Sequence, residues 1–275
     1  MFTTITIMNR QKQTKLKDLI LTWKTNTVYS SRFLTNLGYS RQLINQYEQA
    51  GWVARVGRGA YRRGGEDVDY TSGLYALQKQ DRLAIHVGGL SAMEYHGKGH
   101  YLQLGKRPRV TLFGNQGTRI PKWFVTADWA IALEFYATNL FKKDHSLGLI
   151  EKDCGGYSVS CSTLERAMLE VCAIMRTQSD FEHALRLMEG LSGSTASDVE
   201  VLLSACRSVK AKRLFLYMAD HHHFSWVEQL NNKKYTLGIG PRQIVKQGMY
   251  DAQFKITVPK FMLYEKMNNP DSVPF

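Results

Sequence analysis

The stretch SRQLINQYEQAGWVARVGRGAYRR, residues 40–63, decides the fold of the N-terminal part of this chain. Its first half predicts a helix over residues 41–50, because Ser40 is a favoured N-cap residue and Gly51 stands where helices end in a left-handed residue. Three apolar residues fall on one face of this helix: Leu43, Ile44 and Tyr47.

A hairpin follows this helix, and two further helices precede it. The runs at 52–56 and 60–63 are β-prone and flank Gly57-Arg58-Gly59, a tight turn in which glycine supplies the positive φ. Upstream, residues 15–24 place apolar side chains at helical spacing, and a short helix from Arg32 to Gly38 has Ser30 or Ser31 as its cap. Short helices joined by a turn and followed by a basic hairpin predict a winged helix-turn-helix.

Four amide side chains share the face of the 41–50 helix opposite its apolar residues, at spacings of i, i+3, i+4 and i+7. Amides can bond bidentately to N6 and N7 of adenine in the major groove, and an arginine at a hairpin tip suits a narrow minor groove. The alternative is an ordinary solvated helix face. The residues that we expect to read bases are Arg41, Gln42, Asn45, Gln46, Gln49 and Arg58.

The charge of the chain is unevenly distributed. Its 275 residues include 36 Lys and Arg against 24 Asp and Glu, a formal net charge of +12. Residues 1–65 hold eleven of the basic residues and only two acidic ones, so this segment carries +9 and the remaining 210 residues carry +3. Such a concentrated surplus favours duplex DNA as the partner over a merely solvated basic face. The residues that we expect to hold phosphates are Lys15, Lys17, Ser31, Arg32, Arg55, Arg62 and Arg63.

The remainder of the chain predicts a mixed α/β region and then a helical one. Residues 64–67 have the composition of a linker, and residues 70–80 predict a helix. Residues 84–97 predict a strand, a Gly-Gly turn and a helix closed by Gly97, and strand-like runs follow at 109–113, 133–141, 147–151 and 157–160.

The helical signal is strongest from Cys161 onward. Ser162 with Glu165, and Ser197 with Glu200, have the spacing of capping boxes. Apolar residues follow at helical spacing after the first of them: Leu164, Ala167, Met168, Val171, Cys172 and Met175. Further helices are predicted at 181–188 and around 211–220, and strands near 235–239 and 250–258.

These elements predict an α+β fold in two domains. We expect a winged helix-turn-helix over residues 1–65 and a larger domain over residues 70–275, mixed α/β over 70–160 and mainly helical over 161–275.

Three stretches together resemble the AbiEi-type antitoxins: the hairpin region from Trp52 to Tyr61, VGGLSAMEYHG at 87–97, and VSCSTLERAMLEV at 159–171. The resemblance covers nearly the whole chain in the same order. It implies an antitoxin that represses its own toxin–antitoxin operon through inverted repeats in the promoter and counteracts a nucleotidyltransferase toxin in phage defence. It further implies that antitoxic activity resides in the C-terminal domain, without need of a stable toxin complex.

Several classes of protein are disfavoured by what the sequence lacks. There is no apolar run of about 18 residues that would span a membrane, and the first twenty residues lack the apolar core of a secretory signal, so a cytoplasmic protein is expected. Phosphate-loop, dinucleotide-binding and serine-hydrolase motifs are missing, so we expect neither enzyme activity nor a cofactor. The four cysteines have no C-x-x-C spacing and are expected to be reduced and mostly buried: Cys154, Cys161, Cys172 and Cys206.

The histidines are considered as candidate metal ligands. Asp220 precedes three consecutive histidines, 221–223, but consecutive residues of a helix point about 100° apart and do not converge on one ion. His86, His96 and His100 would converge only through the fold. No metal site is therefore expected.

Two other functions stay open on the residues alone. One is a ligand-responsive winged-helix transcription factor with an apolar pocket in the larger domain. The other, less favoured, is a nuclease that a winged helix directs to DNA. A neighbouring reading frame for a nucleotidyltransferase would separate the antitoxin from both.

Overall fold

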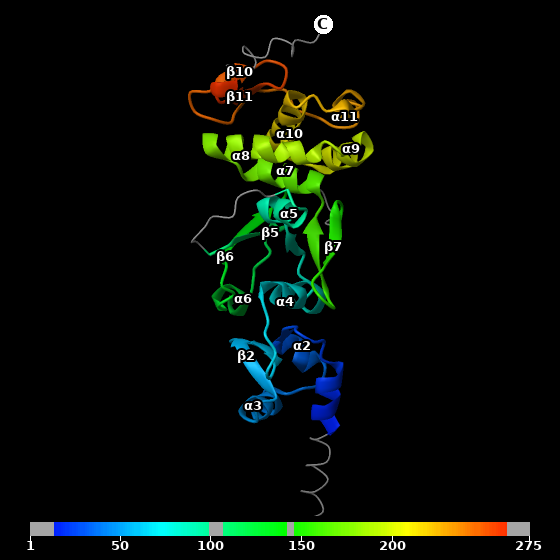
Figure 1. Cartoon of the computed structure of the whole chain (residues 1–275), viewed down its shortest axis with the longest axis vertical. Helices are drawn as coiled ribbons and strands as arrows, with labels where there is room; N and C mark the ends of the chain where they lie inside the picture. The colour runs from blue at the N-terminus through cyan, green and yellow to red at the C-terminus, as the bar shows by residue number, and fades with distance from the viewer. Residues whose placement is uncertain (1–13, 99–106, 142–145, 263–275) are drawn as a thin grey trace, which may run out of the picture.

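The computed structural model describes residues 14–98, 107–141 and 146–262. Figure 1 shows an elongated stack, with the N-terminal helices and hairpin at one end and a sheet in the middle. A layer of helices lies above the sheet, and a small sheet lies at the far end. The fold is mixed α+β, as predicted. Within the described ranges, no helix is long and apolar enough to cross a membrane.

The N-terminal elements follow the predicted order. Residues 14–22 are helical, and the elements after them are α2 (Ser31–Asn36), α3 (Arg41–Gln49), β2 (Val53–Gly57) and β3 (Ala60–Arg63). The sequence did not predict β1 (Tyr29–Ser30), which pairs antiparallel with β3 and gives the sheet order β1-β3-β2. A hydrophobic cluster joins these elements, formed by Leu19, Trp23, Tyr29, Leu34, Ile44, Tyr47, Val53 and Tyr61.

Residues 64–67 are hydrogen-bonded to the N-terminal elements. The prediction that they form a linker is therefore wrong. The backbone N–H of Gly64 donates to the carbonyl of Trp52 at 2.8 Å. The carboxylate of Glu66 accepts a hydrogen bond from the backbone N–H of Asn26 at 3.0 Å. This segment therefore ends the hairpin by packing back onto it.

The predicted helix at 70–80 is α4 (Tyr70–Tyr75), continued by a π-helical turn, η1 (Ala76–Gln80). The end of η1 holds strand β1. The side chain of Gln80 donates to the carbonyl of Val28 at 2.7 Å and accepts from the backbone N–H of Ser30 at 3.0 Å. The hydroxyl of Ser30 donates to Asp81 at 2.9 Å. These bonds join the N-terminal elements to the rest of the chain.

The central sheet has five strands in the order β6-β5-β4-β8-β7. These are β4 (Ile85–Val87), β5 (Arg109–Asn115), β6 (Ala132–Thr138), β7 (Leu149–Asp153) and β8 (Ser158–Ser162), each within a few residues of its predicted run. The sheet is mixed, because β4 pairs antiparallel with β5 and parallel with β8. Helix α5 (Gly89–Tyr95) follows β4 as predicted, whereas the short α6 (Lys122–Thr126) was not predicted.

The helical layer consists of α7 (Leu164–Ile174), α8 (Gln178–Met188), η2 (Glu189–Leu191), α9 (Ala196–Ala205), α10 (Val209–His221) and α11 (Ser225–Glu228). Both predicted capping boxes are wrong. Thr163 caps α7 by accepting from the N–H of Arg166, because Ser162 still belongs to strand β8. Thr195 caps α9, which places Ser197 inside the first turn.

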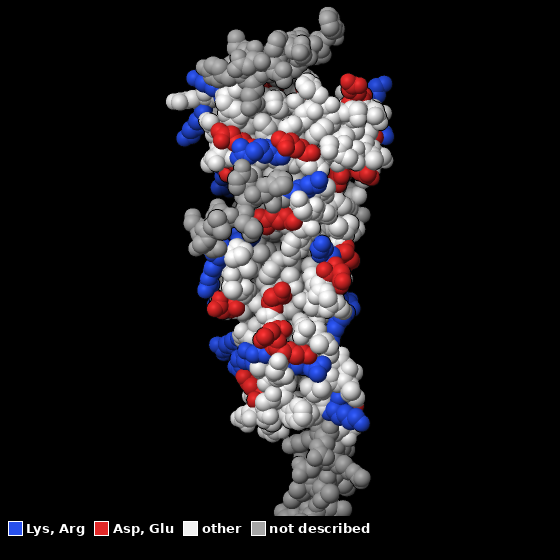
Figure 2. Space-filling model, in the orientation of Figure 1, with Lys and Arg blue, Asp and Glu red and all other residues white. Residues whose placement is uncertain are grey.

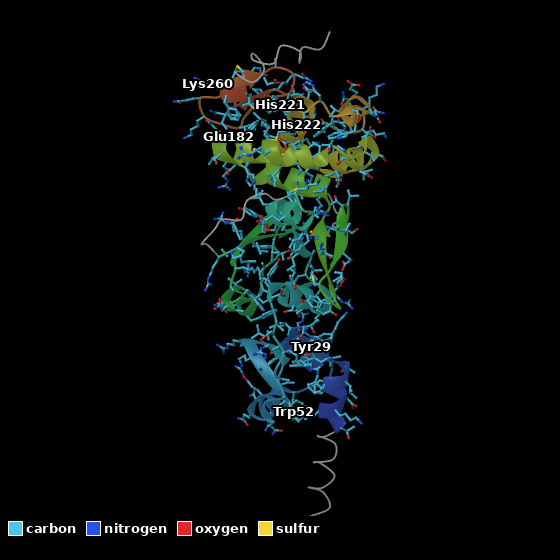
Figure 3. The ribbon with its side chains drawn as sticks, in the orientation of Figure 1. Tyr29, Trp52, Glu182, His221, His222 and Lys260 are labelled. Carbon is cyan, nitrogen blue, oxygen red and sulfur yellow. The ribbon has the colours of Figure 1, made fainter. Side chains whose placement is uncertain are left out.

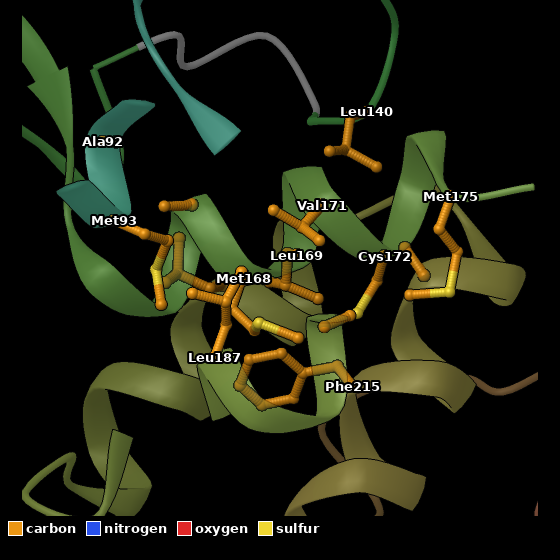
Figure 4. Packing of buried hydrophobic residues seen from close by; sticks show 14 of the residues in the cluster. Ala92, Met93, Leu140, Met168, Leu169, Val171, Cys172, Met175, Leu187 and Phe215 are labelled. Atoms are coloured by element: carbon orange, nitrogen blue, oxygen red, sulfur yellow. The ribbon is translucent and has the colours of Figure 1, made fainter. Parts of the chain in front are cut away.

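Helix α7 carries the predicted apolar face, and the structure buries its other face as well. Met168 and Cys172 are fully buried and pack toward Phe215 of α10 (Figure 4). On the opposite side α7 contacts α5 and the sheet, so Arg166 and Glu170 are also buried. The apolar residues thus predicted one buried face of α7, whereas in the structure two faces are buried.

A buried arginine organises the C-terminal segment. Arg213 of α10 is 1% exposed, and its guanidinium donates to four backbone carbonyls at 2.7–3.1 Å, those of Leu237, Gly238, Gly240 and Lys255. Residues 235–239 lie in this irregular segment, so the strand predicted there is wrong. The region predicted at 250–258 contains β10 (Met249–Asp251) and β11 (Ile256–Val258), with β9 (Arg242–Gln243) beside β11.

The carboxylate of Glu170 on α7 connects this helix to β4 and β8 of the central sheet and to α5. Oε1 lies 2.8 Å from His86 Nε2 of β4 and accepts from Arg166 Nε at 2.9 Å. Oε2 accepts from the backbone N–H of Gly89 and from the hydroxyl of Ser162, each at 2.9 Å. Burial alone would raise the pKa of Glu170, but the charges and hydrogen bonds of His86 and Arg166 lower it to about 2.

Replacement of Glu170 by Gln should destabilise the protein by about 3–5 kcal/mol at pH 7, because Arg166 would remain buried without its counter-charge. Since the folded-state pKa of Glu170 lies below its ordinary value of 4.5, the stabilisation is complete above that value and is lost as the pH falls toward about 2. Chemical denaturation at pH 7, 4 and 3 measures both effects. The control is Glu228→Gln, at an exposed position of α11. Equal pH dependence in the wild type and Glu170→Gln would contradict this role.

Candidate nucleic-acid interface

Helix α3 is fixed by its cap and by two buried side chains. The Ser40 hydroxyl accepts from the backbone N–H of Leu43 at 3.2 Å, as predicted, and the left-handed Gly51 follows the helix with φ +78°. Ile44 and Tyr47 are 3% and 6% exposed and pack into the N-terminal hydrophobic cluster. Because these residues occupy the inner side of α3, the opposite side is left to solvent.

The four amides of α3 share that exposed side. The side chains of Gln42, Asn45, Gln46 and Gln49 are all exposed, as is Arg41 in the first turn. The structure thus brings five of the six residues predicted to read bases onto one accessible helix. Such accessibility is a condition for the bidentate pairing of an amide with adenine that the sequence analysis expects.

Arg58 lies at the turn of the β2–β3 hairpin. Its side chain is exposed, and Gly59 beside it has φ +107°, a conformation that glycine adopts without strain. The carbonyl of Gly59 accepts from the backbone N–H of Ser31 at 2.8 Å. This bond sets the hairpin turn against the start of α2. Trp52 lies at the other end of the hairpin, away from the central sheet (Figure 3).

The residues predicted to hold phosphates fall into two groups. Lys15, Lys17 and Arg32 are exposed, and Ser31 is half-buried at the first position of α2. None of these three basic side chains forms an ion pair with a carboxylate in the part of the chain that the structure describes, although the charge of Arg32 acts on Asp81. Their charged groups are therefore accessible to solvent.

The second group is engaged within the protein. Arg55 forms a two-bond ion pair with Glu48 of α3, at 2.7 and 3.1 Å, and this hydrogen bonding raises its pKa. Arg62 donates to the carbonyl of Glu66, and Arg63 Nε lies 3.3 Å from the carboxylate of Glu66. These three arginines tie the hairpin to its neighbours. Glu48 belongs to α3, whereas Glu66 lies only four and three residues beyond Arg62 and Arg63, just outside the basic segment 1–65.

Basic side chains also occur outside the N-terminal region. On the face shown in Figure 2, Lys and Arg are spread along the length of the molecule and interspersed with acidic residues. Arg119, a basic residue outside the N-terminal region, precedes α6 and lines a cleft together with Arg32 and Arg41. Sequence analysis did not single out Arg119, because nothing near it in the chain indicates a partner.

The histidines considered as metal ligands have other partners. His86 binds Glu170, and His96 Nε2 lies 2.8 Å from the carbonyl of Ser162. His222 Nε2 lies 2.8 Å from the carbonyl of Leu185, at the end of the molecule opposite the hairpin (Figure 3). His100 lies outside the described residues, as do Arg10 and Lys12. No group of three or more potential metal ligands occurs among the described residues.

The four cysteines are free thiols, and three of them are buried, as predicted. Burial raises the pKa of Cys161 to about 12 and raises that of Cys172 as well. The thiol form of both is favoured at neutral pH, which suits small core residues and not nucleophiles.

A search of curated proteins found no match for this chain. Among solved structures, the crystal structure of the RV2827C protein from Mycobacterium tuberculosis is similar, with a TM-score of 0.53 and 13% sequence identity. The match covers 92% of this chain and 93% of that one. At this identity, the likeness concerns the fold alone.

The comparison with protein families accounts for most of the chain. Residues 12–104 match the family described as "Transcriptional regulator, AbiEi antitoxin N-terminal domain". Residues 107–259 match "Transcriptional regulator, AbiEi antitoxin, Type IV TA system", where TA stands for toxin–antitoxin. These descriptions are of regulators and antitoxins and not of enzymes, in agreement with the prediction from the sequence. The chain belongs to the AbiEi antitoxin family, the transcriptional regulators of type IV toxin–antitoxin systems.

Proposed function

We propose that this protein is a DNA-binding antitoxin that represses its own operon and counteracts a nucleotidyltransferase toxin in phage defence. The observation that carries the proposal is the exposed amide face of α3 beside Arg41 and Arg58, in a chain that belongs to a family of transcriptional regulators. The operon, the class of toxin and the role in phage defence come from the family resemblance. The family resemblance also implies that protection does not require a stable complex with the toxin, so the proposal includes no direct complex.

Residues 1–65, called the N-terminal unit below, act in this proposal as a winged helix-turn-helix. Helix α3 enters the major groove and reads bases through Gln42, Asn45, Gln46 and Gln49, while Arg58 at the hairpin tip reaches the minor groove. Support comes from the exposure of these side chains and from the bond between Gly59 and Ser31 that places the hairpin turn beside α2.

Phosphate contacts are assigned to the unpaired basic residues of this unit. Lys15, Lys17 and Arg32 hold the backbone on either side of the groove, with the hydroxyl of Ser31 beside them. Arg55, Arg62 and Arg63 contribute less than the sequence led us to expect, because each would have to give up or share a partner within the protein.

The larger domain, residues 70–275, carries the antitoxic activity in this proposal. It carries a net charge of +6 over 206 residues, against +9 over the first 65, so it depends less on a polyanion than the N-terminal unit does. The two activities should therefore be separable by substitutions on the DNA-binding surface.

The full chain should bind mixed-sequence duplex DNA with strong salt dependence. If about six cations meet phosphates, affinity should fall about a thousandfold between 50 and 200 mM salt. Arg58→Glu should weaken binding at each salt concentration, because it adds repulsion to a lost contact. Fluorescence anisotropy measures both effects, with Arg207→Glu as a control at an exposed arginine of the helical layer. Equal losses in the two variants would refute the placement of the interface.

Substitutions of residues that read bases and of residues that contact DNA phosphates should differ in how far their effect depends on the DNA sequence. Gln46→Ala should cost about 1–3 kcal/mol at its preferred base pair and nothing elsewhere, whereas Lys17→Ala should weaken binding to all sequences alike. Selection from a random duplex library gives the preferred site, and affinities for it and for single-base variants test the distinction. A uniform loss with Gln46→Ala would remove this residue from base reading.

Repression and protection should separate in cells. A variant with Arg58→Glu and Lys17→Glu should fail to repress the promoter yet still protect against the cognate nucleotidyltransferase toxin, because both changes lie outside the larger domain. Growth under toxin induction and promoter activity are measured side by side, with melting temperature as the check on folding. A folded variant that loses both activities together would show that protection requires DNA binding.

A further inference from the structure

A cleft of about 600 Å³ opens where the N-terminal unit meets the loop before α6. Its walls come from segments far apart in the sequence: the start of α2, the start of α3, the hairpin turn at Gly59, residues 81–83 after η1, and residues 119–123. The cleft therefore lies beside the N-terminal end of α3 and the hairpin turn, which are the parts of the N-terminal unit that face DNA in the proposed function.

Three arginines from three different segments line this cleft: Arg32 of α2, Arg41 of α3 and Arg119 of the loop before α6. All three are exposed, and none forms an ion pair with a carboxylate in the described part of the chain, although the charge of Arg32 acts on the nearby Asp81. Three like charges around one cleft repel one another, and an anion in the cleft would relieve that repulsion. Guanidinium groups match phosphate geometrically, because they donate two parallel hydrogen bonds.

The other polar groups of the lining agree with an anionic ligand. Ser31 and Asn36 add a hydroxyl and an amide, both of which can donate to a phosphate oxygen. Asp81 is the single carboxylate in the lining, and it accepts a hydrogen bond from the hydroxyl of Ser30 at 2.9 Å. Burial raises the pKa of Asp81, and the charge of Arg32 opposes that rise, so Asp81 offsets part of the charge of Arg32, while Arg41 and Arg119 have no such neighbour in the lining.

Two of these segments, the hairpin and the start of α6, are in close contact. A Cβ added to Gly57 at the end of β2 would lie only 3.0 Å from the carbonyl oxygen of Trp123, so hairpin and α6 approach as closely as glycine permits. Trp123 is itself 5% exposed, and Gln80 fixes β1 by hydrogen bonds to Val28 and Ser30. Arg119 therefore has a defined position relative to Arg41, although it lies outside the segment expected to bind DNA.

We propose that this cleft binds a phosphate group of the DNA backbone, and that Arg119 supplies a contact from outside the N-terminal unit. The inference rests on the proposed function, because DNA held by α3 and the hairpin brings its backbone to this cleft. A free phosphate or a nucleotide offers the same chemistry, so the experiment has to separate the two sources. DNA is favoured because the cleft shares Arg41 and the hairpin turn with the proposed interface.

The test uses the full chain with Arg119→Glu, Arg119→Lys and the control Arg207→Glu. Arg119→Glu should lower affinity for a mixed-sequence duplex about tenfold or more and reduce the slope of log affinity against log salt by about one or two. Arg119→Lys should recover most of the affinity, since it keeps the charge, and Arg207→Glu should bind as the wild type does. Equal melting temperatures establish that the variants are folded.

A second arm adds inorganic phosphate or ATP, without DNA, and follows the melting temperature. Unchanged duplex binding by Arg119→Glu, together with loss of stabilisation by these anions, would assign the cleft to free phosphates and overturn the DNA source. Unchanged behaviour in both arms would overturn the site altogether. If Arg58→Glu weakens duplex binding while Arg119→Glu does not, this inference fails and the proposed function stands. A wild type that binds no duplex would refute the proposed function itself.

Discussion

The burial of one carboxylate, Glu170, constrains the arrangement of the sheet and the helices. Its two oxygens receive groups from β4, from the start of α5, from the end of β8 and from α7 itself. A buried charge is tolerated only when its counter-charges and hydrogen bonds are all in place. The backbone must therefore bring these four elements together, and Gly88 leaves the necessary room, because a Cβ there would collide with the carboxylate and with Phe113.

The N-terminal unit is attached to this framework by polar bonds and by one close backbone approach. Gln80 and Asp81 hold β1, while Gly57 of the hairpin packs against Trp123. Two buried apolar residues of the unit, Val28 and Ala60, belong to the large hydrophobic cluster of the central sheet. The exposed face of α3 is thereby presented in a fixed orientation relative to the central sheet.

The basic residues among the first 65 fall into two groups in the structure, one bonded within the protein and one exposed to solvent. Arg55, Arg62 and Arg63 form bonds within the protein to Glu48 and Glu66, whereas Lys15, Lys17, Arg32, Arg41 and Arg58 remain exposed. A net charge indicates the sign of the partner but does not identify the residues that meet it. The distinction arises because a bidentate ion pair occupies the donors that a phosphate would need.

Interactions within one turn or hairpin were readable from the sequence alone. Ser40, Ile44, Tyr47 and the glycines around Arg58 specified α3 and its hairpin, because caps, periodicity and turns depend on neighbouring residues. The helix caps at Thr163 and Thr195 were missed, because more than one hydroxyl residue stands near the start of each helix and any of them can cap it; at α7, Ser162 is excluded because it belongs to β8. Only the tertiary structure decided the burial of Glu170, the pairing of Arg55 and the convergence of Arg119 with Arg32 and Arg41. Those contacts join residues of separate elements, and local spacing carries no information about which distant segments the fold brings together.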